Sequence, residues 1–365
     1  MKFLDEYQDP KLSKAYLKEI QRITSKDKKW NIMEFCGGQT HSLVKNGIVN
    51  LLPDNIQLIH GPGCPVCVTP ISTIDHAIEL ANQKDVILCS FGDMLRVPGS
   101  TNSLLDAKAN GGNVRFFYSP MDAVQLAKEN PDKEVVFLAV GFETTAPANA
   151  LSVVHANLYG LKNYSILTSH VLVPPAIEAI LSEEDCVVDG VLGAGHVCSV
   201  MGLDEYEKIV EKFQIPIVVT GFEPVDLLQG ILMTIHQLEK GEAKLENQYS
   251  RVVPSKGNPI AQQTINQIFE VFDKEWRGIG TLPGSGWQIK SEYADYDASK
   301  KFKLSKGQVD NETECIAGEI LKGAKKPVDC PLYGKECTPV NPVGAPMVSS
   351  EGACAAYYHF NRILG

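Results

Sequence analysis

The sequence predicts an α/β fold with two similar, Rossmann-like domains, each built on a parallel sheet, followed by a small irregular C-terminal domain. Short β-rich apolar runs alternate with helical patterns over most of the chain, which is typical of parallel α/β units. After about residue 275 this alternation fades, and glycine and proline become frequent. Four of the ten cysteines lie in that last segment.

The N-terminal segment, residues 1–30, is expected to be helical. Its first part, MKFLDEYQDPKLSKAYLKEIQR, lacks the apolar core of a signal peptide and has the spacing of an amphipathic helix. No apolar run approaches the roughly 20 residues of a membrane span. Because the ten cysteines accompany no secretion signal, we expect a cytoplasmic protein whose thiols serve metal or redox chemistry.

The balance of charge argues against two classes of partner. The chain has 34 Lys and Arg residues and 44 Asp and Glu residues, a net charge of −10, with no block of basic residues. Nucleic acids and anionic membrane surfaces attract basic patches, so neither is expected as the main partner.

Two series of strands are expected, with helices between them. The strands are predicted at 32–35, 56–60, 86–91, 114–119 and 135–140, and then at 164–170, 187–193 and 215–221. The helices are predicted at 70–83, 120–129, 144–158, 174–182, 203–213, 224–240 and 257–273. Two sheets of about four strands fit better than one very large sheet. The expected domains are therefore 31–140, 141–275 and 276–365.

Two segments of the chain resemble each other. VVFLAVGFETTAP and IPIVVTGFEPVDL both place an apolar strand before Gly-Phe-Glu and the start of a helix. They are either an internal repeat or two turns with the same local preference, since an acidic residue is favourable at a helix N-terminus.

The four cysteines of the C-terminal segment indicate a metal site. Cys315, Cys330, Cys337 and Cys354 are separated by 14, 6 and 16 residues. Thiolates bind iron–sulfur clusters or zinc, and either would stabilise a segment that lacks an apolar core. The gaps are wider than those of zinc knuckles, and the spacing alone does not choose between the two metals or exclude simple burial.

Cys36 is the first candidate reactive thiol. In IMEFCGGQTHSL it stands at the end of a strand, before two glycines and a helix start. Free backbone N–H groups at that position lower a thiol's pKa and favour metal binding or nucleophilic attack. His41 is expected in the first helical turn, leaning toward the same site; the alternative is a glycine turn with a buried cysteine and a surface histidine.

Cys64 and Cys67 form the second candidate, in the rigid loop GPGCPVC at 61–67. This Cys-x-x-Cys also follows a strand and precedes a helix, where open α/β sheets place their sites. A cysteine pair at a helix N-terminus is the arrangement of a redox-active dithiol. Half a zinc site, part of a cluster and simple packing remain as alternatives.

Glu143, Thr144 and Thr145 are the polar candidates, in GFETTAPA after another strand. They could line the same cleft as acceptor and hydroxyl groups, although helix capping explains them equally well. Of the other thiols, Cys89 and Cys186 are expected to be small core residues. The segment GAGHVCSVMG, which contains His196 and Cys198, is a less favoured candidate for the cleft between the domains.

In their order along the chain, CGGQTH, GPGCPVC, GFETTAP, LPGSGW and the four C-terminal cysteines resemble the HypD family. HypD proteins help to build the Fe(CN)2CO group of [NiFe]-hydrogenases. The resemblance extends from about residue 30 to the C-terminus, and the motifs are specific in combination. Gln39 departs from it, because the family's first motif often has His there; this weakens any role for that side chain but leaves Cys36 and His41 in place.

The resemblance implies roles for the two cysteine motifs. Cys36 corresponds to the thiolate that holds iron during assembly, with His41 beside it. Cys64 and Cys67 correspond to the family's redox-active pair in the central cleft. A one-electron cluster next to such a two-electron pair could relay electrons to the site.

The resemblance also implies the cofactor and the partners. The four C-terminal cysteines correspond to the ligands of a [4Fe-4S] cluster, which favours iron over zinc. The family works with the small protein HypC, whose N-terminal cysteine gives the iron a second thiolate, and with HypE, which delivers cyanide. Two other functions stay open: a cluster-coupled thiol–disulfide reductase, and a zinc-stabilised binding module without redox chemistry.

Overall fold

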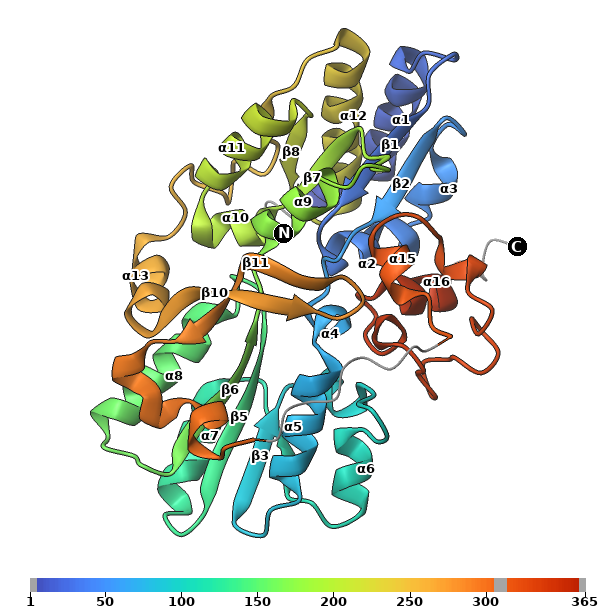
Figure 1. The fold of residues 1–365 in the computed structure, drawn as a ribbon. Helices are drawn as coiled ribbons and strands as arrows, with labels where there is room; N and C mark the ends of the chain where they lie inside the picture. Colours follow the sequence, from blue (N-terminus) through green and yellow to red (C-terminus); the bar gives the residue numbers. More distant parts are fainter. Residues whose placement is uncertain (1–4, 305–313, 361–365) are drawn as a thin grey trace.

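The computed structural model describes residues 5–304 and 314–360, and it confirms the α/β fold with two parallel sheets (Figure 1). The α-helices are α1 (Pro10–Ile23), α2 (Gly37–Lys45), α3 (Ile48–Leu51), α4 (Pro65–Val68), α5 (Ile71–Ala81), α6 (Leu104–Ala109), α7 (Pro120–Glu129), α8 (Ala146–Leu158), α9 (Val173–Leu181), α10 (Gly195–Met201), α11 (Asp204–Phe213), α12 (Pro224–Lys240), α13 (Pro259–Ile268), α14 (Ala298–Lys301), α15 (Ala317–Leu321) and α16 (Ala353–Phe360). Short 3-10 turns lie at Asp5–Gln8, Gly92–Arg96, Ser291–Tyr296, Pro327–Asp329 and Ala345–Met347.

The first sheet has five parallel strands in the order β2–β1–β7–β8–β9. Its strands are β1 (Trp30–Glu34), β2 (Ile56–His60), β7 (Gly190–Ala194), β8 (Ile217–Thr220) and β9 (Leu245–Asn247). Helices α1 and α12 pack on one face, and α9 and α11 pack on the other. Because helices cover both faces, the strands read as continuous apolar runs.

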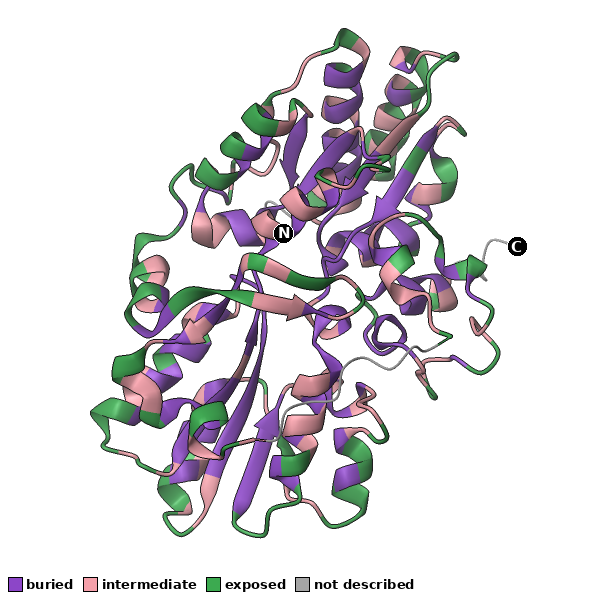
Figure 2. Ribbon diagram, viewed as in Figure 1, coloured by how far each residue is buried: buried purple, intermediate pink, exposed green. Residues whose placement is uncertain are grey.

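The second sheet has four parallel strands in the order β4–β3–β5–β6. Its strands are β3 (Val86–Ser90), β4 (Val114–Phe116), β5 (Glu134–Gly141) and β6 (Tyr164–His170). Helices α7, α8 and α13 cover one face, and α5 and α6 cover the other. Figure 2 shows both sheets as buried layers with exposed residues on the outer helix surfaces.

The sequence suggested that the strands are divided between the two sheets at about residue 140, but the structure divides them differently. Strands β1 and β2 share one sheet with β7, β8 and β9, and the segment that contains β3 to β6, which lies between them in the sequence, forms the second sheet. Apolar periodicity identifies strands but carries no information about which strands pair, because parallel partners are usually far apart in sequence. The expected domains 31–140 and 141–275 therefore cut across both sheets.

A β-hairpin connects the two halves of the molecule, and the sequence pattern did not predict it. Strands β10 (Phe269–Trp276) and β11 (Gly280–Ile289) pair antiparallel between the sheets. The predicted helix 257–273 ends as α13 at Ile268, because pairing with β11 overrides the helical spacing of the apolar residues there. Trp276 and Trp287 are buried in the cores of the first and the second sheet, so this part of the expected C-terminal domain belongs to the main body.

Residues 314–360 form a small irregular unit beside α2 and α4 (Figure 1). The unit has a small apolar core of its own, which includes Ile320, Met347 and Ala355. Helix α16 packs on α2, where Val44 contacts the core residues Ala356 and Tyr357. An irregular C-terminal unit is thus present. Its composition suggested that it lacks an apolar core, but apolar packing contributes to its order.

Candidate functional site

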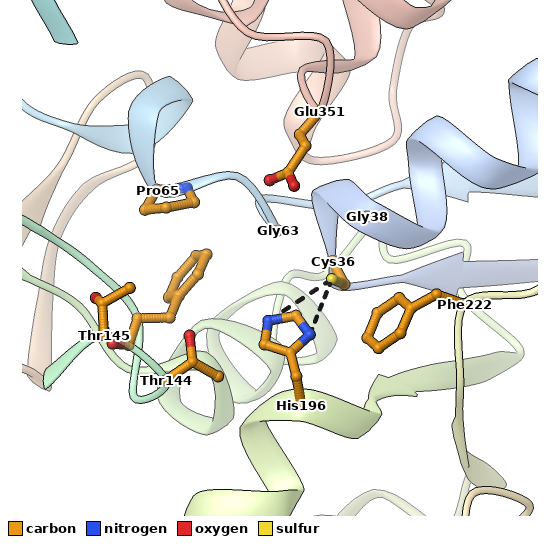
Figure 3. A pocket seen from close by; sticks show the side chains of 10 residues that line it. Cys36, Gly38, Gly63, Pro65, Thr144, Thr145, His196, Phe222 and Glu351 are labelled. Atoms are coloured by element: carbon orange, nitrogen blue, oxygen red, sulfur yellow. Dashed lines mark hydrogen bonds between the residues drawn. The ribbon is translucent and has the colours of Figure 1, made fainter. Parts of the chain in front are cut away.

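A pocket of ≈ 430 Å³ lies where the two sheets and the C-terminal unit meet (Figure 3). All but one of its lining residues follow the carboxyl ends of five parallel strands, and the exception, Glu351, precedes α16. The lining residues are Cys36, Gly38, Gly63, Pro65, Phe142, Thr144, Thr145, His196, Phe222 and Glu351. Turns at the carboxyl ends of parallel strands are where α/β folds bind ligands. The two sheets point these ends toward each other, so residues far apart in the chain share one pocket.

Cys36 lies in the wall of this pocket. It is the N-cap residue of α2, with extended backbone angles, and its Sγ is 3.6 Å from Nδ1 of His196. Its side chain is only 2% exposed. Burial raises the pKa of the Cys36 thiol, and hydrogen bonds from the backbone N–H groups of Gln39 and Gly38 oppose this only in part. The N–H groups lie where the sequence predicted, but the prediction of a lowered pKa is wrong because burial outweighs them.

His41 does not lie beside Cys36, contrary to the prediction. Its Nδ1 donates to the carbonyl oxygen of Ser350 at 3.1 Å, and its ring packs edge-on against Phe360. Five residues at 100° each turn a helical side chain about 140° away from the starting direction, so position 41 faces the C-terminal unit. His41 connects α2 to that unit instead of lining the pocket.

His196 occupies the place expected for His41. It comes from the first turn of α10, after β7, in the segment that the sequence analysis favoured less. Its ring lies 5.1 Å from that of Phe222, and burial lowers the pKa of His196 to about 4. In a neutral imidazole one ring nitrogen donates a hydrogen bond and the other accepts one. The resemblance between the two Gly-Phe-Glu segments was a usable signal, since Phe142 and Phe222 both line this pocket.

Cys64 and Cys67 lie directly behind the Cys36 loop. Cys64 is the N-cap of the short helix α4, and both side chains are buried free thiols. Burial is the main cause of the raised pKa of Cys67, and the neighbouring Cys64 thiol and the charge of Cys354 raise it further. The two thiols are therefore neighbours, and the C-terminal unit brings a third thiol close to them.

Gly63 makes this close approach possible. The Gly37 N–H donates to the Gly63 carbonyl oxygen at 2.8 Å, which joins the two cysteine loops. A Cβ atom at position 63 would overlap the backbone nitrogen and Cα of Cys36. Only glycine lets the loops of Cys36 and Cys64 pack backbone against backbone.

The polar candidates after β5 have different surroundings. Thr144 and Thr145 line the pocket, but Glu143 is buried behind it. Glu143 Oε1 accepts a hydrogen bond from the Val173 N–H at 2.9 Å, and burial raises the pKa of Glu143 to about 7. The expected cleft role is thus compatible with the positions of the two threonines, while Glu143 supports the turn at α9.

Two further residues matter that sequence reasoning missed or discounted. Gln39 is fully buried, and its Nε2 donates to the Gly193 carbonyl oxygen and to Thr220 Oγ1. This side chain therefore ties α2 to β7 and β8. Glu351 lines the pocket from the C-terminal unit, and no local pattern marked it. Burial raises the pKa of Glu351, and the charge of His41 opposes this rise.

The remaining thiols lie outside the pocket. Cys89 is buried in β3 and belongs to the core of the second sheet, as expected. Cys186 is half-buried and packs against the core of the first sheet. Cys198 is buried on α10, and burial raises the pKa of its thiol to about 12.

The four C-terminal thiols lie close enough to influence one another. Burial raises the pKa of Cys354, and the charges of Cys315, Cys337 and Cys330 add to this. The Val343 N–H donates to Cys337 Sγ at 3.4 Å.

The surroundings of the four C-terminal thiols indicate what kind of metal group they could hold. A Cβ atom added at Gly344 would overlap the sulfur of Cys315, so a glycine leaves room for that thiol. Within residues 5–304 and 314–360, no three His, Cys, Asp or Glu side chains are arranged like the ligands of a single metal ion. Four neighbouring thiols, with an N–H donor at one sulfur, are the donor set that an iron–sulfur cluster uses.

The fold and the site define a class: a cysteine-rich α/β protein with a thiol in a pocket between two parallel sheets and a thiol-rich C-terminal unit. No helix in the described part of the chain is both long and apolar enough to cross a membrane. The family model described as "HypD: Hydrogenase formation hypA family" matches residues 11–361.

Individual relatives agree over the whole length. The chain is 46% identical over 370 residues to hydrogenase maturation factor HypD2 of Bradyrhizobium diazoefficiens, covering 99% of this chain and 97% of the relative. It is 47% identical over 369 residues to hydrogenase maturation factor HypD of Azotobacter vinelandii, with the same coverage. For HypD of Escherichia coli the identity is 44% over 368 residues, with 99% of each chain covered. The chain therefore belongs to the HypD family of hydrogenase maturation factors.

Proposed function

We propose that this protein is the scaffold on which the Fe(CN)2CO group of [NiFe]-hydrogenase is assembled, with Cys36 holding the iron. The observation that carries the proposal is the position of Cys36 Sγ in the pocket wall, 3.6 Å from His196 Nδ1. The iron group is the cargo of this pocket. A thiolate is a suitable donor for iron that carries strong-field cyanide and CO ligands.

The pocket also offers groups for the cyanide ligands. Their nitrogen atoms accept hydrogen bonds, and Thr144 and His196 present a hydroxyl and a ring N–H group along one side. The Thr145 hydroxyl also lines the pocket but donates to the Phe142 carbonyl oxygen at 3.2 Å. Phe142 and Phe222 form apolar walls, and a CO ligand needs no hydrogen bond. A mixture of donors and apolar surface around a single thiol is suited to hold a small group with both kinds of ligand.

Metal binding must overcome the burial of Cys36. Burial favours the neutral thiol, so the proton has to leave when the sulfur binds iron. His196 is the side chain hydrogen-bonded to this sulfur, and its pKa is lowered to about 4 by burial. We expect the metal charge to supply most of the stabilisation of the thiolate, because the protein alone does not.

Cys64 and Cys67 are proposed as the redox pair of the site. Reduction of their disulfide takes two electrons and two protons and returns two thiols. Both residues are free thiols in the structure, and the charge of Cys354 adds to the raised pKa of Cys67. Cys315, Cys330, Cys337 and Cys354 would hold the proposed [4Fe-4S] cluster, which supplies one-electron transfer when bound.

The proposed partners follow from the family. A HypC-like protein would contribute a second thiolate to the iron, and a HypE-like protein would deliver cyanide. The relatives' names support a role in hydrogenase maturation. Infrared spectroscopy of the anaerobically purified complex with a HypC-like partner tests the proposal directly, because CN and CO stretches report the bound group. A thiol–disulfide reductase, the alternative function, would show no such bands.

Substitution of a cluster thiol should abolish the colour of the protein. In Cys330→Ser and Cys337→Ser we expect the loss of most of the broad visible absorbance, since each removes one of four cluster ligands. Without the cluster, residues 314–360 should also become more sensitive to protease, because their own apolar core is small.

Cys186→Ser is the matched control, because this half-buried thiol packs on the core of the first sheet. It should retain the absorbance. Full iron and sulfide content together with an intact absorbance band in Cys330→Ser and Cys337→Ser would refute the cluster assignment.

Mild oxidation should convert Cys64 and Cys67 into a disulfide. We expect a mass difference of two hydrogens, confined to the peptide that contains both residues, because the Cys64 thiol is close enough to raise the pKa of Cys67. Alkylation and peptide mass measurement, with and without reductant, detect it. In Cys64→Ser the difference should disappear. If both thiols remain alkylable after oxidation while the cluster is intact, the redox assignment fails.

A further inference from the structure

A buried chain of hydrogen bonds runs from Cys36 to the C-terminal unit, and the assembly chemistry proposed above does not use it. The Cys36 N–H donates to Glu34 Oε2 at 2.9 Å. Glu34 Oε1 lies 2.8 Å from Nδ1 of His60, and Nε2 of His60 lies 3.2 Å from the Tyr357 hydroxyl. The exposed fractions of Glu34, His60 and Tyr357 are 0%, 5% and 6%, so water does not compete for these bonds.

The donors and acceptors of this chain can be assigned. A carboxylate only accepts, so Nδ1 of His60 donates to Glu34. In the neutral ring Nε2 accepts, and the Tyr357 hydroxyl donates to it. Burial raises the pKa of Tyr357 to about 12, which keeps this hydroxyl protonated. Thr40 Oγ1 donates to Glu34 as well.

Sheet pairing and helix geometry set the two ends of the chain. Glu34 and His60 are register partners at the ends of β1 and β2. Tyr357 follows Cys354 by three residues on α16, so both side chains lie on the same side of that helix. The ring of Tyr357 also packs edge-on against His60 at 5.4 Å. A proposed cluster thiol and the amide of Cys36 are therefore connected through three buried side chains.

A buried carboxylate is costly unless its hydrogen bonds are satisfied, so the position of Glu34 depends on its donors. One of these donors, His60, is held in turn by Tyr357 of the C-terminal unit. Displacement of α16 would free His60 and then Glu34. The hydrogen bond that fixes the Cys36 backbone would weaken as a result.

We propose that Glu34, His60 and Tyr357 are positioning residues that couple the order of the C-terminal thiol unit to the backbone of Cys36. The inference rests on the proposed function, because it concerns the thiol proposed to hold iron. The Cys36 loop is then correctly placed only when the C-terminal unit is fully assembled.

Hydrogen exchange at the Cys36 amide, measured by mass spectrometry of the purified full chain, tests this coupling. In Tyr357→Phe we expect about tenfold faster exchange, the effect of one lost buried hydrogen bond. The exchange rates of backbone amides in β5 of the second sheet should be unchanged, which distinguishes local loosening from global unfolding. Tyr118→Phe is the matched control, because the Tyr118 side chain is 92% exposed. Unchanged exchange at Cys36 in Tyr357→Phe would overturn the proposal.

Two variants at position 60 distinguish the two hydrogen bonds of His60, one to Glu34 and one to Tyr357. In His60→Asn the side-chain amide can replace Nδ1 at Glu34 but does not reach Tyr357. In His60→Gln the side-chain amide can reach Tyr357, but it can no longer replace Nδ1 of His60 as the donor to Glu34. We expect His60→Asn to behave like Tyr357→Phe, and His60→Gln to accelerate Cys36 exchange at least as much. Wild-type exchange rates in both variants would contradict a positioning role.

A double-mutant cycle tests the coupling itself. Cys337→Ser should accelerate exchange at Cys36 in the wild-type background, but add little in the Tyr357→Phe background. Independent, multiplicative effects on the rate would overturn the coupling. If Cys337→Ser leaves the visible absorbance intact, the cluster assignment fails, while the effect of Tyr357→Phe still tests the positioning role by itself.

Discussion

Replacement of Cys36 by alanine is expected to abolish the CN and CO infrared bands of the complex with a HypC-like partner. Cys36 is the thiol that lines the pocket, so no other sulfur there can take its place on the iron. The visible absorbance of the C-terminal unit should remain, because its four thiols are separate from this pocket. Infrared and absorbance spectra of the same anaerobic sample measure both effects.

Two histidine variants serve as comparisons for Cys36→Ala. His196→Ala should weaken or shift the bands, since Nδ1 of His196 lies 3.6 Å from the sulfur. His41→Ala should change them much less, because His41 faces Ser350 and Phe360 outside the pocket. Bands of wild-type intensity in Cys36→Ala would mean that the iron is held elsewhere, and Cys64 and Cys67 would be the next ligands to test.

Gly63→Ala is expected to destabilise the protein strongly. The added methyl group would overlap the backbone of Cys36, and a backbone cannot move aside as the end of a side chain can. We expect the free energy of unfolding to fall by about 2 kcal/mol or more, the cost of overpacking a tight contact. The CN and CO bands should also be lost, because the loop of Cys36 is displaced.

Gly92→Ala is the control for this substitution. A Cβ atom at position 92 would have no neighbour within 4 Å, so the unfolding free energy should change little. Urea titrations of both variants measure the difference. If Gly63→Ala unfolds at the wild-type urea concentration and retains the bands, the close packing of the two cysteine loops is not required for the site.

Much of the local structure could be predicted from the sequence. Helices α7 and α12 have the predicted bounds, and the predicted strands at 56–60 and 164–170 coincide with β2 and β6. Apolar periodicity and turn chemistry determine these elements, and both are properties of neighbouring residues. The positions of Cys36 and Cys64 at the ends of strands followed from the same patterns.

The composition of the pocket could be predicted only in part. Cys36, Thr144 and Thr145 line it as proposed, because each follows the carboxyl end of a strand. His196 replaces His41, since direction around a helix depends on the exact helix start. Glu351 comes from the C-terminal unit, and no pattern near it in the sequence indicates a contact with a loop that lies more than 300 residues earlier.

The sequence by itself determined the α/β class, the strand-to-helix turns that carry the cysteines, and membership of the HypD family. These depend on local patterns and on motifs that can be read without knowing any contact. Only the tertiary structure decided that β1 and β2 join β7, β8 and β9 in one sheet, and that the other strands form the second. It also decided that Cys36 is deeply buried, so that desolvation and not the helix N-terminus governs its pKa. Strand pairing and burial arise from contacts between distant segments, and a one-dimensional pattern does not contain them.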